Sequence, residues 1–535
     1  MTTSSSSRPP RRTALRALAV AVAVVGSTLP TWNASATGGP HSGPGTTAAA
    51  TPTYTLTIHH LGRDGQVAPR YKTQITEFAG QGNTEVLTPT DTSGTTTVRL
   101  PKGRYLLSSM LHGKTNAEGT DWVVQPRLDL NRDTSLTIDS RTTKPVDVRP
   151  QDDSAEHVSG TMFVAAEHDG ATRYANVIVA TPTLRVAHRG PAAEAGSVQR
   201  WYDVYWHGKQ HRYALGDVST GDRALTGLVR HPADKDLAEV KIRGAAHPGS
   251  DGMAVLDVTP STRDTAGSYV AAMPAPGTVS FLFSPQRGKY NIGYTNPRTE
   301  EEGPSSWYEV RNVSPRLGRS LTHTFDNGVF GPKLDGSPGV TRTGNRIAVD
   351  VPLLADGDGH QPFEQPYDTA STTLYRNGQK VKTVTGKPGR ATFDVPTGRA
   401  NYRVTATVRR TGQRGAATTV TASWTFASQR TAAAAKLPVS VVRFAPALGL
   451  DGTAPAGKAL RVPVSVQGPA RGHVRALDVA YSVNGGTSWQ RAAVVGGVAT
   501  VPAQKAGTAV TLRAKLTDTA GNTLTQTAVS AYRTR

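Results

Sequence analysis

The 535-residue chain contains no cysteine. This absence excludes disulfide cross-links, thiolate metal sites, thiol nucleophiles and thiol redox chemistry. A disulfide typically stabilises a fold by about 2–4 kcal/mol, so a chain without one depends on buried apolar surface instead. With 37% hydrophobic residues, 54 glycines and 36 prolines, the composition is typical of a turn-rich globular protein with ample core and not of a disordered chain.

Long apolar runs are also missing, because no segment after the N-terminal region reaches the roughly 18 apolar residues of a membrane-spanning helix. The first 36 residues have the pattern of a secretory signal peptide. They combine a basic region, an apolar run over 17–26 and a cleavage site at Ala34-Ser35-Ala36; the basic residues are Arg8, Arg11, Arg12 and Arg16. We therefore expect a secreted protein, extracellular or associated with the cell wall, with Sec and twin-arginine export both open.

Acidic residues are scarce relative to basic ones. The chain has 60 Lys and Arg against 40 Asp and Glu, and +16 of its +20 charge remains once the signal peptide is removed. The stretch from Lys436 to Arg535 carries 12 basic and three acidic residues. A solvated surface is the simplest interpretation, and attraction to an anionic cell-wall polymer is the sharper one. Nucleic acid is not expected, because no basic helix or aromatic-plus-basic RNA-binding motif occurs.

Short alternations of apolar and polar residues recur along the chain between turn signals. Tyr54, Leu56 and Ile58 alternate with polar residues, and Asn377-Gly378 separates two β-rich runs. This spacing predicts an all-β fold of tandem β-sandwich domains of immunoglobulin or fibronectin-III type. We expect a linker over 37–53, a sandwich over 54–150, a larger irregular β domain over 151–334, a sandwich over 335–428, a linker over 429–436 and a C-terminal sandwich over 437–535.

The tripeptide Gly486-Thr487-Ser488 matches the sequence around the nucleophile of subtilisin-like peptidases. That nucleophile begins a long buried helix and needs a histidine base oriented by an aspartate. Here alternating residues from Leu477 to Val483 lead into Asn484-Gly485, and Trp489 opens the next strand. We therefore expect Ser488 to lie in a turn.

The densest aromatic cluster is predicted to form a hairpin, with strands over 201–206 and 211–215 and a turn over 207–210. On such a strand one face packs into a core, and the other could be an exposed platform for a sugar or peptide. Core or cross-strand packing is the preferred interpretation, and a binding platform is the alternative. The candidate binding residues are Trp201, Tyr202, Tyr205, Trp206 and Tyr213.

Metal sites have little support in the sequence. Asp356 and Asp358 open a calcium-loop-like Asp-Gly-Asp-Gly, but Tyr367 stands where an EF-hand needs an acid, so a β-turn is the preferred interpretation and a weak calcium site the alternative. His207 and His211 would share a face only on a helix, and the predicted hairpin removes that geometry for a metal site. His59 and His60 should point to opposite faces of a strand, so they are not expected to bind one metal ion together. No cofactor is expected.

Several longer stretches carry a family resemblance, including YTLTIHHLGRDG, LDLNRDTSLTIDSRTTKPVDV, FDNGVFGP, VDVPLLADGDGH and LRAKLTDTAGNTLTQTAVSAY. In their order and coverage of the mature chain they resemble the non-catalytic C-terminal region of large secreted subtilisin-like serine peptidases of actinomycetes. The resemblance implies accessory β domains, here without a peptidase domain and its catalytic triad.

These observations predict a non-catalytic, monomeric extracellular protein that binds or scaffolds. Its expected partner is an anionic cell-wall polymer or a secreted protein or peptidase. A degenerate relative of the peptidases with no surviving role also stays open. The enzymatic alternative is a glycan-active hydrolase or lyase with its site in residues 151–334. Two close carboxylates of raised pKa in a cleft would favour that alternative, and flat aromatic patches would favour binding.

Overall fold

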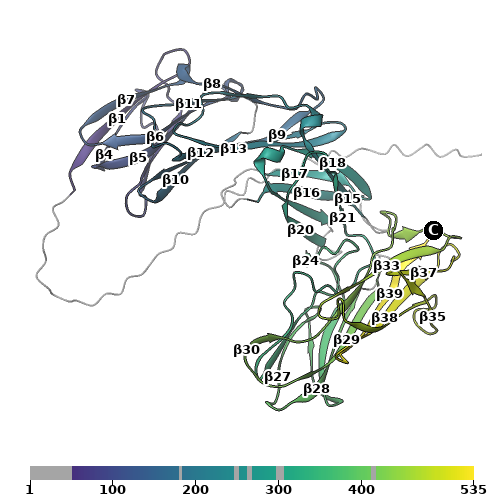
Figure 1. The fold of residues 1–535 in the computed structure, drawn as a ribbon. Coiled ribbons are helices and arrows are strands. Elements are labelled where there is room, and N and C mark those ends of the chain that lie inside the picture. The colour runs from purple at the N-terminus through teal and green to yellow at the C-terminus, as the bar shows by residue number, and fades with distance from the viewer. Residues whose placement is uncertain (1–50, 180–182, 246–251, 262–267, 297–305, 411–416) are drawn as a thin grey trace, which may run out of the picture. The chain divides into compact units, whose positions relative to one another are not determined.

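The computed structural model describes residues 51–179, 183–245, 252–261, 268–296, 306–410 and 417–535. The predicted signal peptide and most of the following linker lie outside them. The described residues form 39 β-strands and four short 3-10 helices, η1 (Asn116–Glu118), η2 (Ser140–Thr142), η3 (Asp234–Asp236) and η4 (Pro285–Arg287) (Figure 1). Among them, no helix is long and apolar enough to cross a membrane. The predicted all-β class is confirmed.

Two sheets enclose the first core. The β1 sheet has the order β4 (Thr95–Pro101), β1 (Thr53–Leu61) and β7 (Thr134–Asp139). The β6 sheet has the order β14 (Leu228–Arg230), β8 (Lys144–Val148), β11 (Leu184–His188), β6 (Thr120–Leu130), β5 (Gly103–His112), β2 (Tyr71–Glu77) and β3 (Thr84–Leu87). Leu56 and Ile58 of β1 pack with Leu107 of β5 and Val123 of β6, as the alternation predicted.

The β12 sheet is covered on both faces. Its order is β10 (Ala171–Val179), β9 (Glu156–His168), β12 (Val198–His207), β13 (His211–Gly221), β18 (Gly277–Phe283), β15 (Ala238–Gly244) and β21 (Leu321–Phe325). Tyr202 and Leu282 pack towards the β6 sheet, whereas Tyr205 and Phe281 pack towards the β19 sheet. The β19 sheet consists of β17 (Tyr269–Pro274), β16 (Met253–Pro260), β19 (Tyr290–Asn296), β20 (Ser306–Val313) and β24 (Pro362–Glu364).

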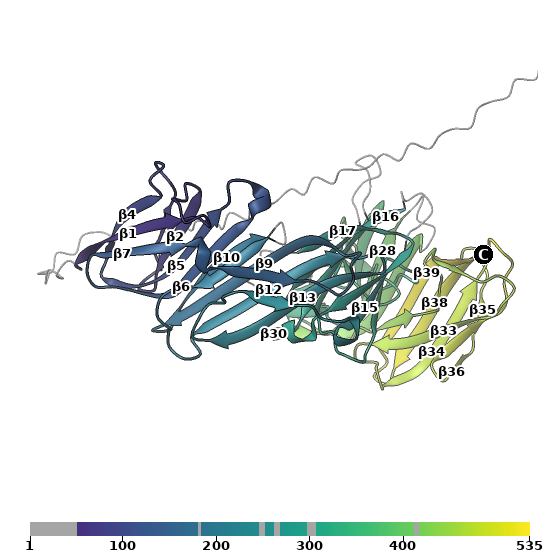
Figure 2. The same ribbon diagram turned by 90° about the horizontal axis from the view of Figure 1, so that it is seen from above.

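The C-terminal part shares one large sheet. The β29 sheet has the order β26 (Gln379–Thr385), β25 (Thr369–Arg376), β28 (Ala400–Arg409), β29 (Thr419–Ser428), β39 (Thr523–Thr534), β38 (Ala509–Asp518), β34 (Val474–Ser482) and β35 (Gln490–Arg491), with β32 (Thr453–Ala454) beside β39. Figure 2 shows β38 and β39 near the C-terminus. One continuous core joins this sheet to two smaller ones. The first of these has the order β27 (Arg390–Asp394), β23 (Arg346–Asp350), β22 (Gly339–Gly344) and β30 (Thr431–Lys436). The second has the order β31 (Val441–Phe444), β33 (Leu460–Gln467), β37 (Val498–Val501) and β36 (Val494–Val495).

Strand pairing crosses the predicted domain limits. Strands β11 and β14 follow residue 150 in the sequence, yet they pair with β6 and β8. Strand β29 precedes residue 428 and pairs with β39 of the final segment. The stretch predicted to be a linker over 429–436 contains β30, which pairs with β22. Sheets, and not consecutive segments, are therefore the units of this fold.

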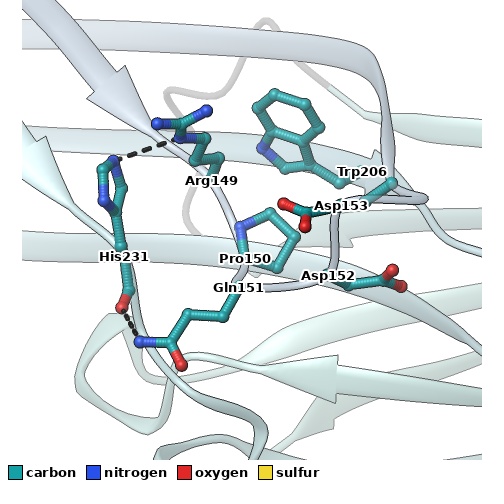
Figure 3. A pocket seen from close by; sticks show the side chains of 8 residues that line it. Arg149, Pro150, Gln151, Asp152, Asp153, Trp206 and His231 are labelled. Carbon is teal, nitrogen blue, oxygen red and sulfur yellow. Dashed lines mark hydrogen bonds between the residues drawn. The ribbon is translucent and has the colours of Figure 1, made fainter.

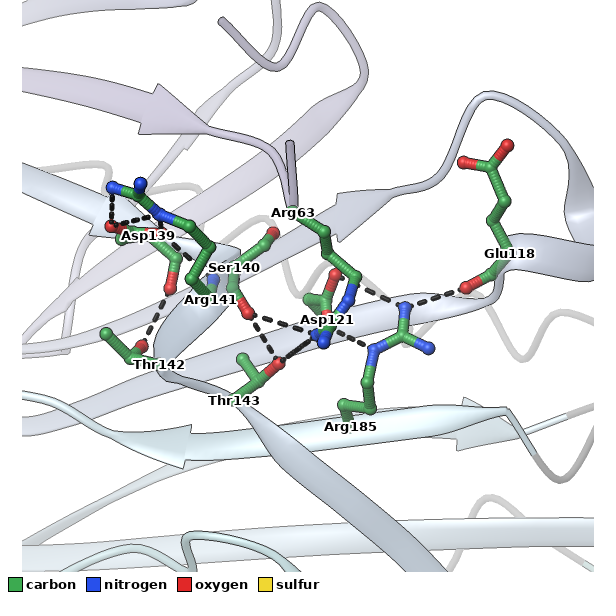
Figure 4. Close-up of polar contacts among 9 residues, drawn as sticks. All are labelled: Arg63, Glu118, Asp121, Asp139, Ser140, Arg141, Thr142, Thr143 and Arg185. Carbon is green, nitrogen blue, oxygen red and sulfur yellow. Dashed lines mark hydrogen bonds and ion pairs between the residues drawn. The ribbon is translucent and has the colours of Figure 1, made fainter. Parts of the chain in front are cut away.

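A buried aspartate joins segments on both sides of residue 150 (Figure 4). Asp121 of β6 is 3% exposed and accepts hydrogen bonds from Arg185 Nε at 2.6 Å and Thr143 Oγ1 at 2.6 Å. Arg63 Nη1 lies 3.3 Å from the same carboxylate oxygen. Because a buried carboxylate is stable only when it is paired, this cluster fixes β11 against β6.

The predicted turns are present. Strands β12 and β13 form the expected antiparallel hairpin, with His207 ending one strand and His211 beginning the other. Asn377 and Gly378 both have positive φ, 48° and 84°, as the tight hairpin between β25 and β26 requires. Ser488 lies exposed between β34 and β35, where its N–H donates to Asn484 Oδ1 at 3.0 Å. The turn prediction for Ser488 is confirmed.

Candidate functional site

The predicted aromatic cluster is buried. All five rings are at most 8% exposed: Trp201 6%, Tyr202 7%, Tyr205 0%, Trp206 8% and Tyr213 0%. The sequence showed two faces on β12, and the structure covers one with the β6 sheet and most of the other with the β19 sheet. Trp201 stacks on Phe163 with ring centroids 4.9 Å apart. The hairpin therefore does not offer the exposed platform that the binding hypothesis required, and core packing describes it instead.

Trp206 nevertheless forms one wall of an open pocket (Figure 3). The pocket has a volume of about 370 Å³ and is lined by Arg149, Pro150, Gln151, Asp152, Asp153, Ala155, Trp206 and His231. The indole is held in place because its Nε1 donates to Val148 O at 3.0 Å. An apolar wall with a polar rim suits a small hydroxylated ligand.

Charged groups fix the rim of this pocket. The Asp147 carboxylate pairs with His231 Nε2 at 2.8 Å and with Arg149 Nε at 3.2 Å. Gln151 Nε2 donates to the backbone carbonyl of His231 at 3.1 Å. Hydrogen bonds from Ser154 lower the pKa of Asp152, so this carboxylate is ionised at neutral pH. A second pocket of about 360 Å³ shares His231 and includes Tyr202.

Asp356 and Asp358 accept hydrogen bonds from backbone N–H groups. Asp356 is fully buried, and its oxygens accept from the His360 N–H at 2.7 Å, His360 Nδ1 at 3.0 Å and the Asp326 N–H at 3.2 Å. Asp358 Oδ2 accepts from the Thr324 N–H at 2.8 Å. No group of three metal-ligating side chains occurs within the described ranges. The turn prediction is confirmed, because the Gly359 N–H donates to Asp356 O at 2.9 Å, and the weak calcium site stays a prediction.

An exposed aromatic pair occurs on the outer face of the β19 sheet. Trp307 of β20 is 45% exposed and Phe363 of β24 is 55% exposed, and their ring centroids lie 4.7 Å apart. The Arg311 guanidinium lies 5.5 Å from the Phe363 ring centroid, and Arg311 Nε pairs with Glu309 at 2.5 Å. Sequence reasoning missed this pair because Phe363 joins Trp307 only through sheet pairing. Alternation around Trp307 showed a two-faced strand but not which face was exposed.

Two carboxylates share this face with the aromatic pair. Asp257 of β16 and Glu309 of β20 flank Gly293 of β19 in the strand register. Partial desolvation, and then the charge of Glu309, raise the pKa of Asp257 to about 6. Exposed Val270 (50%) lies opposite Asp257 in the strand register, and exposed Met253 (41%) begins β16. Acceptors beside an exposed tryptophan suit the hydroxyls and apolar faces of a sugar.

The C-terminal segment has a basic surface. Six exposed cations have no ion-pair partner within the described part of the chain: Lys458, Arg461, Arg475, Lys505, Lys515 and Arg533. Arg471, Arg491 and Arg535 pair with Asp335, Asp478 and Asp451. We call these six residues the basic surface; Arg461 lies on β33 and Lys515 on β38, so the cations are spread over two sheets that share one core. The excess positive charge that the sequence places between 437 and 535 is therefore exposed to solvent at these six side chains.

No protein-family model matches the chain, and no curated protein matches it. Solved structures align with it at 10% identity. BcpA, the major pilin subunit of Bacillus cereus, covers 51% of this chain and 99% of its own, with a TM-score of 0.13. The alignment with Sidekick-1 immunoglobulin domains 1–5 covers 89% of this chain and 94% of the other, with a TM-score of 0.12. The alignment with a tetra-tandem repeat in the extending region of a large adhesion protein covers 89% of this chain and 98% of the other, with a TM-score of 0.12.

At these scores the alignments establish no shared architecture, and no functional argument rests on them. The fold itself defines the class: a protein of tandem β-sandwich sheets. The resemblance to accessory regions of subtilisin-like peptidases stays a prediction.

Proposed function

We propose that this chain is a secreted, non-catalytic binding or scaffolding protein that holds an anionic cell-wall polymer through the basic surface. The observation that carries the proposal is the set of six exposed, unpaired cations in a segment with few acids. Because they are exposed, each contact is weak, and affinity comes from their number along a polymer. Such binding falls steeply with salt, since screening acts within about 8 Å at physiological ionic strength.

The test is a pull-down of residues 37–535 on purified cell-wall material at low salt and at about 0.5 M salt, where exposed charges are largely screened. The variant Lys458→Gln/Arg461→Gln/Arg475→Gln removes three charges from the basic surface. The control Lys72→Gln/Lys102→Gln/Arg132→Gln removes three exposed charges elsewhere.

We expect wild-type and control proteins to bind at low salt and to be released at high salt. The basic-surface variant should bind roughly 100-fold more weakly, because each of the three removed cations contributes about 1 kcal/mol near an anionic surface. Equal weakening of both variants would assign binding to net charge alone and overturn the proposed surface. Failure of the wild type to bind would direct the search to a secreted protein or peptidase partner.

A second candidate function, glycan recognition, is favoured by the exposed pair Trp307–Phe363 beside Asp257. Retention on the wall that salt does not release would support it, provided that Trp307→Ala abolishes this retention and Val86→Ala, at an exposed position on β3 of another sheet, keeps it. The enzymatic alternative would use Asp257 and Glu309 as its carboxylate pair. Release of new reducing or unsaturated sugar ends, abolished by Asp257→Asn, would support an enzyme over a binding protein.

A further inference from the structure

Strand β10 forms an open edge of the β12 sheet. It spans nine residues, ATRYANVIV, and pairs only with β9 among the described strands. The strand contains no proline, lysine or acidic residue. A long edge of this kind presents unpaired backbone donors and acceptors, which are a template for another strand.

Several other edges of the same molecule are protected. Strand β26 carries Lys380 and Lys382, and β24 begins with Pro362, which has no N–H to offer. At β21, the opposite edge of the β12 sheet, the Thr324 N–H is already bonded to Asp358. Lysine, proline and capping are the usual means by which proteins prevent edge pairing. Strand β10 has none of these features, so its outer backbone edge is open to pairing with another strand.

The side chains of β10 divide into a core face and an exposed face. Ala175 and Val177 pack into the core shared with the β6 sheet. Tyr174 and Ile178 point the other way and are 46% and 57% exposed, with Asn176 between them. The single charged residue, Arg173, is held away from the exposed face, because its Nε and Nη2 donate to the carbonyls of Glu77 and Phe78 at 2.7 Å and 2.8 Å.

We propose that β10 pairs antiparallel with β10 of a second copy of this chain, across a two-fold axis at Asn176. In that register, Ile178 of each copy lies opposite Tyr174 of the other, and the two Asn176 side chains face each other. Aromatic–aliphatic cross-strand pairs stabilise antiparallel strands, and no like charges oppose one another. The pairing is isologous, as expected for a closed dimer, and joins the two β12 sheets into one.

The first test is the mass of residues 37–535 in solution, measured by sedimentation equilibrium over a concentration series. We expect a reversible dimer in place of the monomer predicted from the sequence. Ile178→Lys should halve the mass, because it places a lysine on the edge opposite Tyr174. The matched control is Val270→Lys, which changes an exposed valine on β17, another edge strand, and should leave the dimer intact.

The second test uses the absence of cysteine from the chain. Opposed residues of antiparallel strands have Cα atoms about 4.5–5.5 Å apart, within the range that a disulfide spans. Asn176→Cys should therefore form an intermolecular disulfide quickly under mild oxidation, and Val270→Cys should not.

A monomeric wild type, or equal cross-linking of both cysteine variants, would overturn the β10 dimer. The inference is independent of the proposed function, because Ile178→Lys leaves the basic surface unchanged. If Ile178→Lys is monomeric but still binds the wall at low salt, or if the basic-surface variant is dimeric but no longer binds the wall, the two proposals are separated.

Discussion

Lowering the pH from about 7 to about 4.5 should destabilise the sandwich of the β1 and β6 sheets through one buried imidazole, His60. His60 is 1% exposed and stacks on Tyr71 with ring centroids 3.6 Å apart. Its Nδ1 lies 2.9 Å from Gly94 O, which can only accept, so Nδ1 carries the proton. Nε2 then accepts from Thr73 Oγ1 at 2.8 Å, and Thr73 accepts from Ser109 Oγ at 2.7 Å.

This network holds His60 in its neutral form. Burial lowers its pKa from 6.5 to about 4; the hydrogen bond to Gly94 O opposes the shift, and neighbouring His59 adds to it. Between these two pKa values the unfolded chain binds a proton that the folded chain does not. Stability is therefore present above pH 6.5 and is lost as the pH falls towards 4. Each pKa unit corresponds to about 1.4 kcal/mol, so the loss by about pH 4.5 is about 2 kcal/mol.

The assay is urea unfolding at the two pH values, with a short hydrogen-exchange pulse that reports the unfolded fraction of β1 and β2 peptides. Local probes are needed because a multidomain chain does not unfold in two states. His60→Gln should lower the free energy of unfolding at pH 7. Its further fall between pH 7 and about 4.5 should be about 2 kcal/mol smaller than in the wild type, because glutamine does not titrate. The control is His59→Gln, at the half-buried neighbour whose Nδ1 contacts Thr95 Oγ1, and it should keep most of that dependence because the burial of His60, the main cause of the shift, is unchanged. An unchanged pH dependence in His60→Gln would refute the reasoning.

Two further predictions concern other buried polar contacts. Asp203 is 2% exposed and accepts hydrogen bonds from Arg287 Nε at 2.8 Å and Nη2 at 3.0 Å. Arg287→Met leaves this carboxylate buried without that partner and should lower the free energy of unfolding by about 3–5 kcal/mol. The double variant Arg287→Met/Asp203→Leu should restore most of the loss. A double-mutant cycle of thermal unfolding checks this, and strict additivity would contradict it. Trp424→Phe removes the Nε1 hydrogen bond to Ser440 O at 2.8 Å and should cost about 1–3 kcal/mol in urea unfolding of the β29 sheet. The control is Trp489→Phe, at a half-buried tryptophan under the Arg513 guanidinium.

The sequence by itself determined the local structure. Period-two alternation placed β1, Asn377-Gly378 marked a hairpin, and the turn residues before Trp489 placed Ser488 in a turn. These features depend on neighbouring residues, whose backbone preferences act without the rest of the fold. The absence of cysteine and the excess of basic residues are likewise properties of the chain alone.

The tertiary structure decided what each face contacts. Alternation assigns side chains to two faces of a strand, but only distant strands determine whether a face is covered. The Trp201–Tyr213 hairpin was therefore buried between sheets, while the pair Trp307–Phe363 remained exposed. Sheet membership was equally non-local, since β11 joins β6 and β29 joins β39 across the predicted domain limits. The open edge at β10 follows from the same cause, because no described strand of this chain covers it.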